Sequence, residues 1–182
     1  MELENLLKKV VERLQKTKIP YMLTGGLAVS IWGRPRSTLD LDIVINLKKV
    51  DEEKIYDVLH QDFYINLDEV KLAADKSTSF NIIDRDNGEK IDFYLVHDGE
   101  YEKLRFQRRV NKKLLGISIS VISPEDLILV KLRWYKDSGS TRHLEDAESI
   151  IKISGDKLDK KYLNSWSKKL GVADILISLY KK

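Results

Sequence analysis

The sequence contains no cysteine, so disulfide bonds and thiolate metal sites are both excluded. Its three histidines, His60, His97 and His143, are far apart and lack the spacing of zinc ligands. No apolar run approaches the length of a membrane span, and residues 1–16 are charged throughout, unlike a secretory signal peptide. The net charge of +3 is too small to indicate nucleic-acid binding by itself. These absences favour a cytoplasmic protein.

What is present is typical of a globular protein, since 42% of the 182 residues are hydrophobic and 34% are charged. The pattern predicts an α+β fold, in which a mixed sheet flanked by helices is followed by a C-terminal helical segment. We expect a core at 1–122 and a helical subdomain packed on it at 123–182. Strands are predicted at 21–23, 40–46, 79–83, 91–96 and 117–122. Helices are predicted at 3–14, 27–32, 51–60, 68–74, 124–137, 142–153, 159–170 and 172–181.

Two aspartates, Asp40 and Asp42, stand one residue apart in an apolar strand. Side chains alternate along a strand, so both carboxylates emerge on one face with their Cα atoms roughly 6 to 7 Å apart. From there they can converge on one or two divalent cations, and their hard oxygen atoms favour Mg²⁺ or Mn²⁺. The alternative is an edge strand with one solvated face, although aspartate is a poor strand former.

The second feature is Gly25-Gly26, which follows Thr24 where a strand turns into a helix. Glycines at such a turn let the backbone approach a ligand closely, and the start of a helix offers free N–H groups to phosphate. The Gly-Lys-Ser/Thr ending of a Walker loop is absent, and a plain tight turn is the alternative interpretation.

Two further charged residues interrupt apolar patterns. Asp92 faces away from its apolar neighbours on a later strand, where it can serve as a third metal ligand and accept a proton from an attacking hydroxyl, or simply be solvated. Lys131 interrupts the apolar stripe of a helix, so its ammonium either extends outward to water or meets an anion. The anion would be a carboxylate of the site or a nucleotide phosphate.

Together, Gly25-Gly26, Asp40-x-Asp42 and Asp92 resemble the signature of the DNA polymerase β-type nucleotidyltransferase superfamily. The closer likeness is to a minimal bacterial and archaeal branch that includes AbiEii-type toxins. Its Arg-x-Thr-x-Asp-x-Asp motif is similar to Arg36-Ser37-Thr38-Leu39-Asp40-Leu41-Asp42, and its Pro-Glu-Asp-Leu…Lys-Leu helix is similar to 124–132. Its Arg-Asp-x-x-Asp motif is similar to Arg142-His143-Leu144-Glu145-Asp146, except that His143 replaces the first aspartate. Asp146 is retained and is expected to pair with Lys131 or Arg142.

The resemblance implies a Mg²⁺-dependent (or Mn²⁺-dependent) enzyme that moves a nucleoside monophosphate from a nucleoside triphosphate to an acceptor hydroxyl. The acceptor would be an RNA 3′ end such as that of tRNA, a protein or a small molecule, and a toxin–antitoxin role would fit the branch. The implied catalytic residues are Asp40, Asp42, Asp92 and Lys131, the first three as metal ligands. The implied nucleotide-binding residues are Thr24, Gly25, Gly26, Arg36, Thr38 and Asp146. The alternative function is a catalytically weakened module that binds a nucleotide or a partner on the same fold.

Three other features are assigned structural roles. A basic run could hold RNA, but a solvated helix face followed by a hairpin is the preferred interpretation. Its members are Lys103, Arg105, Arg108, Arg109, Lys112 and Lys113. Trp134 and Trp166, at helical spacing with aliphatic neighbours, are predicted to lie in the core. His143 is predicted to be a surface or packed residue rather than a ligand.

Overall fold

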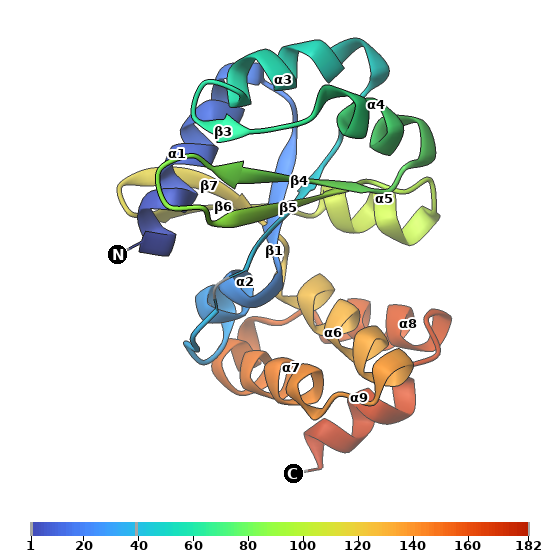
Figure 1. Cartoon of the computed structure of the whole chain (residues 1–182). Coiled ribbons are helices and arrows are strands. Elements are labelled where there is room, and N and C mark those ends of the chain that lie inside the picture. The colour runs from blue at the N-terminus through green and yellow to red at the C-terminus, as the bar shows by residue number, and fades with distance from the viewer. Residues whose placement is uncertain (1, 39, 182) are drawn as a thin grey trace. The chain divides into compact units, whose positions relative to one another are not determined.

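The computed structural model describes residues 2–38 and 40–181 (Figure 1). Leu39, inside the Arg-x-Thr-x-Asp-x-Asp motif, lies outside the described residues. The chain divides into two compact units, the first comprising 1–27 and 38–122 and the second 28–37 and 123–182. The predicted division into a core at 1–122 and a helical subdomain packed on it at 123–182 stays a prediction.

The first unit is built on a seven-stranded sheet in the order β3-β4-β5-β2-β1-β7-β6. Its strands are β1 (Tyr21–Thr24), β2 (Leu41–Ile45), β3 (Phe63–Tyr64), β4 (Ser79–Asp84), β5 (Lys90–Leu95), β6 (Val110–Leu114) and β7 (Ile117–Val121). The β2–β5 and β1–β7 pairs are parallel and the other pairs are antiparallel. The sheet is therefore mixed, and the predicted fold class is confirmed.

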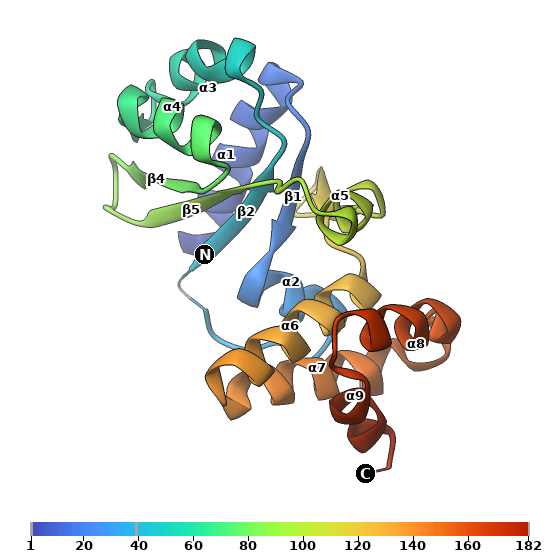
Figure 2. The ribbon, with the colours of Figure 1, turned by 90° about the vertical axis from the view of Figure 1, so that its right-hand side faces the viewer.

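Helices of the first unit bury apolar stripes that their sequences predict. They are α1 (Glu2–Thr17), α3 (Glu52–Leu59), α4 (Leu67–Lys76) and α5 (Glu100–Gln107). Leu6, Val10 and Leu14 recur on one face of α1 and are at most 1% exposed. α1 packs against α3, and α3 against α4 (Figure 2). The helix α2 (Gly25–Trp32) starts at the end of β1, and the chain passes from the first unit to the second within it.

Strands β4 and β5 have one buried and one exposed face. Phe80 and Phe93 stack on the buried face with their ring centroids 5.0 Å apart. The opposite face carries Asn81, Lys90 and Tyr94, all of which are exposed. This alternation follows from the two-residue period of a strand, and it keeps the polar side chains of both strands on the accessible face.

The second unit is helical after residue 122, as predicted. Its helices are the C-terminal part of α2 with α6 (Pro124–Ser138), α7 (Thr141–Ser154), α8 (Lys160–Lys169) and α9 (Ala173–Tyr180). The Ser123 hydroxyl accepts a hydrogen bond from the backbone nitrogen of Asp126 at 3.1 Å, which caps α6. Gly139 ends α6 in the left-handed conformation, φ +70°, which lets α7 return along α6.

The predicted and observed elements differ mainly at two strands. β2 begins at Leu41 and not at Asp40, while β3 is only two residues long and was not predicted. A strand of this length leaves no periodic signal in the sequence. Within 2–38 and 40–181, no helix is long and apolar enough to cross a membrane.

Candidate active site

Asp42 and Asp92 lie directly opposite each other on the neighbouring parallel strands β2 and β5. Adjacent strands are about 4.8 Å apart, so carboxylates on the same face are close enough to share a cation. Both aspartates are partly exposed, whereas Leu41, Ile91 and Phe93 beside them are fully buried. The sequence alternation thus places both carboxylates on the face away from the core.

Asp40 precedes β2, which corrects the prediction that both aspartates belong to one strand. β2 pairs with β1 only as far as Thr24 opposite Asp42, because the chain turns into α2 at Gly25. Asp40 is exposed, and its backbone nitrogen lies 3.4 Å from the hydroxyl oxygen of Thr38. Asp40 lies just before β2, outside the paired strand. Its role as a metal ligand stays a prediction.

The turn from β1 into α2 lies against the Asp42 side chain. Gly25 has a φ of +66°, and a Cβ atom added there would be 1.8 Å from Oδ2 of Asp42. Only glycine therefore allows this carboxylate to approach the backbone so closely. Thr24, directly opposite Asp42, is 5% exposed, and its Oγ1 is buried without a hydrogen-bond partner among the described residues.

Lys90 and Tyr94 complete the same face of the sheet, and the sequence analysis missed both. The Lys90 ammonium lies 2.8 Å from Oδ2 of Asp92, and this hydrogen bond raises the pKa of Lys90. Burial, followed by the negative charges of Asp42 and Asp92, raises the pKa of Tyr94 to about 12. Alternation along 90–94 could have placed both residues beside Asp92, since all three have the same parity.

A hollow of about 450 Å³ opens beside Asp92, within the first unit. One wall comes from α4 and the start of β4, and the other from the exposed face of β4 and β5. Across the sheet, Asn81, Asp92, Asp42 and Thr24 occupy one row of four neighbouring strands. The carboxylate pair therefore has the hollow on its β4 side and the Gly25 turn on its β1 side.

The oxygen atoms on this face suit a hard divalent cation in type. Asp42 and Asp92 supply carboxylates in register, and the Thr24 hydroxyl adds an oxygen that has no hydrogen-bond partner in the described part of the chain. Within the described ranges, however, no three His, Asp or Glu side chains are grouped closely enough to form a ready metal site. Lys90 already neutralises one of the two carboxylates. The donor chemistry fits Mg²⁺ or Mn²⁺, with two carboxylates as the fixed part of the site.

The second unit contains a buried ion cluster centred on Asp146. Lys131, 2% exposed, places its ammonium 2.8 Å from Oδ2 of Asp146, which confirms that this lysine meets an anion. Arg36 binds the same carboxylate through two nitrogens, at 2.9 and 3.2 Å. Arg142 had been one of the two expected partners, but Arg36 is the residue that joins Lys131. Two cations therefore share the Asp146 carboxylate.

Trp134 is 40% exposed, so the prediction that it lies in the core is wrong, whereas Trp166 is buried as predicted. The reason is that Trp134 covers the ion cluster: the Lys131 ammonium lies 5.0 Å from its ring centroid, and the His143 ring centroid lies 5.3 Å away. His143 is thus a packed residue, as predicted. Burial, followed by the charge of Lys131, lowers the pKa of His143, and its Nδ1 has no hydrogen-bond partner among the described residues.

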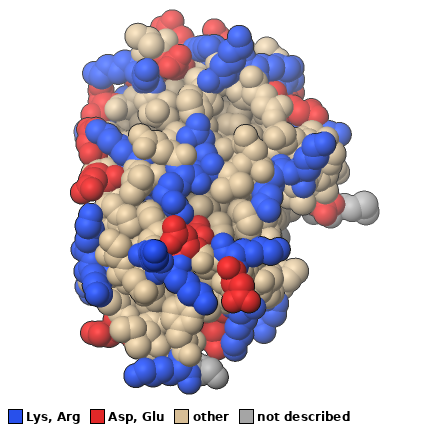
Figure 3. All heavy atoms as spheres, turned by 180° about the vertical axis from the view of Figure 1, so that it is seen from behind, with Lys and Arg blue, Asp and Glu red and all other residues tan. Residues whose placement is uncertain are grey.

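The basic run occupies α5 and the β6–β7 hairpin, as the preferred interpretation expected. Lys103 and Arg105 are paired with nearby carboxylates, and Arg109 stacks over Phe106. On the face drawn in Figure 3, Lys and Arg side chains are interspersed with Asp and Glu side chains. RNA binding by this run stays a prediction.

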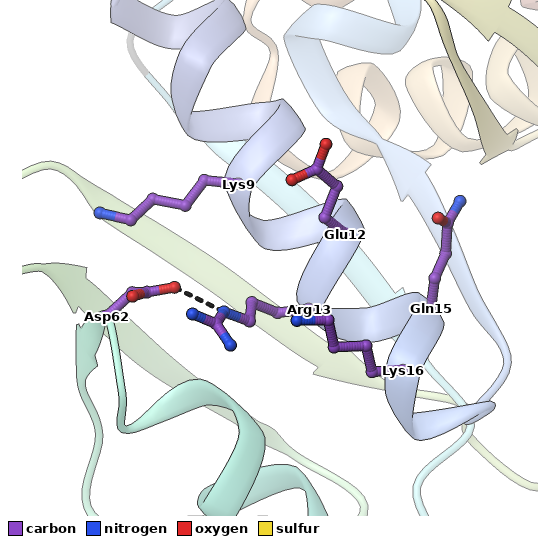
Figure 4. A pocket seen from close by; sticks show the side chains of 6 residues that line it. All are labelled: Lys9, Glu12, Arg13, Gln15, Lys16 and Asp62. Carbon is purple, nitrogen blue, oxygen red and sulfur yellow. Dashed lines mark hydrogen bonds and ion pairs between the residues drawn. The ribbon is translucent and has the colours of Figure 1, made fainter.

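A second hollow, of about 490 Å³, lies along α1 in the first unit (Figure 4). Arg13 points across it to Asp62, with Nε 2.6 Å from Oδ2, and Lys9 lies 2.7 Å from a carboxylate oxygen of Asp84. These cations are already neutralised within the fold. This hollow is therefore a weaker candidate for a nucleotide site than the face that carries Asp42 and Asp92.

Comparison with known proteins gives one family match. The sequence profile of the Aminoglycoside-2''-adenylyltransferase family matches residues 6–148, which is most of the chain. A search of curated proteins finds no significant match.

Several solved structures share the fold. The crystal structure of ANT(2'')-Ia in complex with adenylyl-2''-tobramycin is 14% identical, covers 93% of this chain and 98% of that chain, and has a TM-score of 0.61. A nucleotidyltransferase-like protein from Paracoccidioides brasiliensis is 18% identical over 96% of this chain and 92% of that one, with a TM-score of 0.56. The lincosamide antibiotic adenylyltransferase LnuA, bound to lincomycin, is 14% identical over 82% and 97%, with a TM-score of 0.54. At these identities the likeness is one of fold.

Proposed function

The chain belongs to the aminoglycoside-2''-adenylyltransferase family, and we propose that it transfers a nucleoside monophosphate from a nucleoside triphosphate to a hydroxyl group of a small molecule. Membership confirms the predicted nucleotidyltransferase superfamily and the predicted enzyme class. The observation that carries the proposal is the register of Asp42 and Asp92, opposite each other and beside the Gly25 turn.

The phosphates of the nucleotide bind on the β1 side of the carboxylate pair. Gly25 and Gly26 open α2 there, and backbone N–H groups at the start of a helix are good donors to phosphate. The hydroxyl of Thr24 is buried at the same place without a partner in the described part of the chain, so a bound phosphate or cation would satisfy it.

Asp42 and Asp92 would hold a divalent cation, Mg²⁺ or Mn²⁺, and Asp40 would be a further ligand. When bound, such a cation neutralises negative charge on the phosphate oxygens and lowers the barrier to attack. The closeness of Asp42 to the Gly25 backbone fixes one carboxylate rigidly, which suits a metal ligand that must not move.

The reaction is an in-line displacement at the α-phosphorus. The acceptor hydroxyl oxygen forms a bond to this phosphorus, the bond to the bridging oxygen of the β-phosphate breaks, and pyrophosphate leaves. Asp92 accepts the hydroxyl proton, since it faces the hollow on the opposite side from the phosphate-binding turn.

In the second unit, Arg36 and Lys131 supply positive charge that suits a triphosphate. Their shared partner Asp146 holds both cations in place. We retain Lys131 as a catalytic candidate on this ground, and Arg36, Thr38 and Asp146 as nucleotide-binding candidates.

A small-molecule acceptor is favoured by the family, and ANT(2'')-Ia and LnuA are named for antibiotic substrates. An RNA 3′ end or a protein hydroxyl would instead belong to the AbiEii-type likeness and a toxin–antitoxin role. Pyrophosphate release that requires tRNA or a protein, in the assay described next, would redirect the proposal to one of these acceptors.

Pyrophosphate release tests the proposal. The wild type and Asp42→Asn are incubated with each nucleoside triphosphate and Mg²⁺, in the presence of hydroxylated small molecules, tRNA or a protein extract. We expect release with small molecules, and a loss of at least about a hundredfold in Asp42→Asn, because one fixed ligand is gone. Asp57→Asn, at an exposed position of α3, is the matched control and should retain full activity. An Asp42→Asn variant with undiminished turnover would overturn the proposal.

A binding module without turnover is the second candidate function, because His143 stands where the minimal branch has aspartate. Calorimetry with each triphosphate, with and without Mg²⁺, separates the two functions. Binding without pyrophosphate release, in the presence of every acceptor class, would establish the binding module.

A further inference from the structure

Lys90 lies beside the carboxylates that would hold the divalent cation. It precedes Asp92 by two residues on β5, so both side chains emerge on the same face of the sheet. Its ammonium lies 2.8 Å from Oδ2 of Asp92. The β2–β5 register begins with Leu41 opposite Ile91, and Asp40 and Lys90 each stand one position before this pair. The register therefore brings Lys90 toward Asp40 as well.

The charges of all three aspartates act on this ammonium. The hydrogen bond to Asp92 raises the pKa of Lys90 most, and the charges of Asp92, Asp40 and Asp42 raise it further. The lysine is therefore a cation stabilised by the same carboxylates that suit Mg²⁺ or Mn²⁺. An ammonium on a flexible four-carbon chain imposes no fixed ligand geometry, so it can leave these carboxylates without a rearrangement of the strands.

A divalent cation that binds Asp92 has to compete with Lys90. We propose that Lys90 is an internal counter-ion of the site, which binds Asp92 until the cation arrives together with a nucleoside triphosphate and then moves to a phosphate oxygen. Lys90 is thus a positioning residue that makes the free cation bind weakly and the cation–nucleotide complex bind well. The inference rests on the proposed transfer reaction and adds the residue that sets the order of binding.

The Lys90–Asp92 pair is accessible enough to exchange partners. The Lys90 side chain is 53% exposed and that of Asp92 is 21% exposed, and ion pairs in such positions contribute little to stability. The Lys131–Asp146 pair has the same length, 2.8 Å, but both of its side chains are at most 4% exposed. Opening that buried pair leaves charges without solvent, whereas water or an incoming ion can replace either partner of the Lys90–Asp92 pair.

A phosphate gives the displaced ammonium a new partner. A divalent cation that binds alone repels the ammonium and leaves it to water, which offsets part of the attraction between the cation and the carboxylates. When the cation arrives with a triphosphate, the ammonium can donate a charge-assisted hydrogen bond to a phosphate oxygen. The lysine therefore opposes the free cation and favours its complex with the nucleotide.

Mn²⁺ binding, measured by electron paramagnetic resonance without nucleotide and at low ionic strength, tests the competition. We expect Lys90→Met to bind Mn²⁺ at least about fivefold more tightly than the wild type, and Lys90→Arg, which keeps the charge, to bind as the wild type does. Lys152→Met is the matched control, because Lys152 lies 2.7 Å from Glu148 with side chains 66% and 21% exposed, and it should leave Mn²⁺ affinity unchanged.

The sign of the change separates the counter-ion from a merely structural role. If Lys90 only orients Asp92, its loss disorders a metal ligand, and Mn²⁺ affinity falls. Unchanged or weaker Mn²⁺ binding by Lys90→Met, or equal tightening in Lys152→Met, would therefore overturn the inference. Tightening in Lys90→Arg as large as in Lys90→Met would do so too, because the charge would then not be the cause.

The Mn²⁺ complex of α,β-methylene-ATP, whose α–β bridge resists cleavage, tests the move to phosphate. Calorimetry should show binding at least about fivefold weaker in Lys90→Met than in the wild type and in Lys152→Met. Lys90→Met would thus change the affinities for the free cation and for the complex in opposite directions. Equal affinity of Lys90→Met and the wild type for the complex, or no binding to the wild type, would refute the contact with phosphate.

These measurements need no turnover, so they are separate from the pyrophosphate assay. Lost turnover in Asp42→Asn, combined with unchanged Mn²⁺ binding in Lys90→Met, would refute the counter-ion and leave the transfer mechanism standing. Undiminished turnover in Asp42→Asn, combined with tighter Mn²⁺ binding in Lys90→Met, would refute the transfer mechanism and leave the competition between Lys90 and the cation standing.

Discussion

Gly25 and Asp42 are in such close contact that no side chain can be added at Gly25. A Cβ atom on Gly25 would lie 1.8 Å from Oδ2 of Asp42, and the glycine also has a φ of +66°. The turn that starts α2 and the carboxylate that ends the β1–β2 pairing are therefore one structural feature. The position of the Asp42 carboxylate therefore depends on the absence of a methyl group at the first residue of α2.

Gly25→Ala should abolish nucleotide binding. An alanine in the left-handed conformation destabilises the fold by about 1 kcal/mol. Its Cβ atom would also displace the Asp42 carboxylate. Gly88→Ala is the matched control, because Gly88 has a φ of +76° with no atom within 4 Å of its added Cβ. Calorimetry with a triphosphate and Mg²⁺ should show lost binding in Gly25→Ala alone. Equal binding by both variants would mean that the Asp42 position is unimportant.

Lys131→Met should separate binding from folding. Methionine fits the buried position and Arg36 still neutralises Asp146, so the free energy of unfolding should change by less than about 1 kcal/mol. Nucleotide affinity should fall about tenfold, since a positive charge is lost.

Asp146→Asn is the complementary change in the same cluster. It removes the carboxylate that Lys131 and Arg36 both bind, so it should cost about 3 to 5 kcal/mol in urea unfolding. A larger loss of stability in Lys131→Met than in Asp146→Asn would contradict the view that Asp146 holds the cluster together.

The pKa of Tyr94 should report on the carboxylates beside it. Burial and the charges of Asp42 and Asp92 raise this pKa to about 12, so Asp42→Asn should lower it toward the ordinary value near 10. NMR of ¹³C-labelled tyrosine rings measures the titration, and Tyr94→Phe assigns the signal. A titration that Asp42→Asn does not move would show that the hydroxyl lies away from the carboxylate.

His143 should make the protein less stable in mild acid. Its pKa is lowered in the folded state by burial and by the charge of Lys131, so the unfolded chain binds the extra proton first as the pH falls below about 6.5. Stability is therefore present above this pH and is lost as the pH falls through the folded-state pKa. Unfolding in urea from roughly pH 7 to 5 should show a shallower decline for His143→Gln than for the wild type. His97→Gln, at an exposed residue, is the control.

Local patterns in the sequence predicted the part of the site that depends on strand alternation. Alternation alone places Asp42 and Asp92 away from the core, and the interrupted stripe of α6 predicted that Lys131 meets an anion. The prediction that Asp40 belongs to the strand was wrong because the first residue of β2 depends on where its neighbour β1 turns into α2.

Contacts between distant segments were not predictable in the same way. Arg36 reaches Asp146 across 110 positions of sequence, and nothing local to either residue indicates this pair. Lys90 pairs with Asp92, which is only two residues away. This pair belongs to the candidate site because the β2–β5 register places Asp42 opposite Asp92. Local patterns in the sequence do not reveal which residues of two distant strands lie opposite each other. The prediction for Trp134 was wrong because the Lys131 ammonium and the His143 ring lie against its ring.

The parallel pairing of β2 with β5 also sets when the site can form during folding. Residues 46–89 lie between the two strands, so Asp42 and Asp92 meet only after this whole segment has closed into a loop. Closing such a loop costs entropy before the pairing returns any energy, which makes non-local parallel contacts slow to form. The carboxylate pair is therefore expected to assemble late, after α1 and the β4–β5 hairpin. Nascent or partly folded chains would then lack the site altogether.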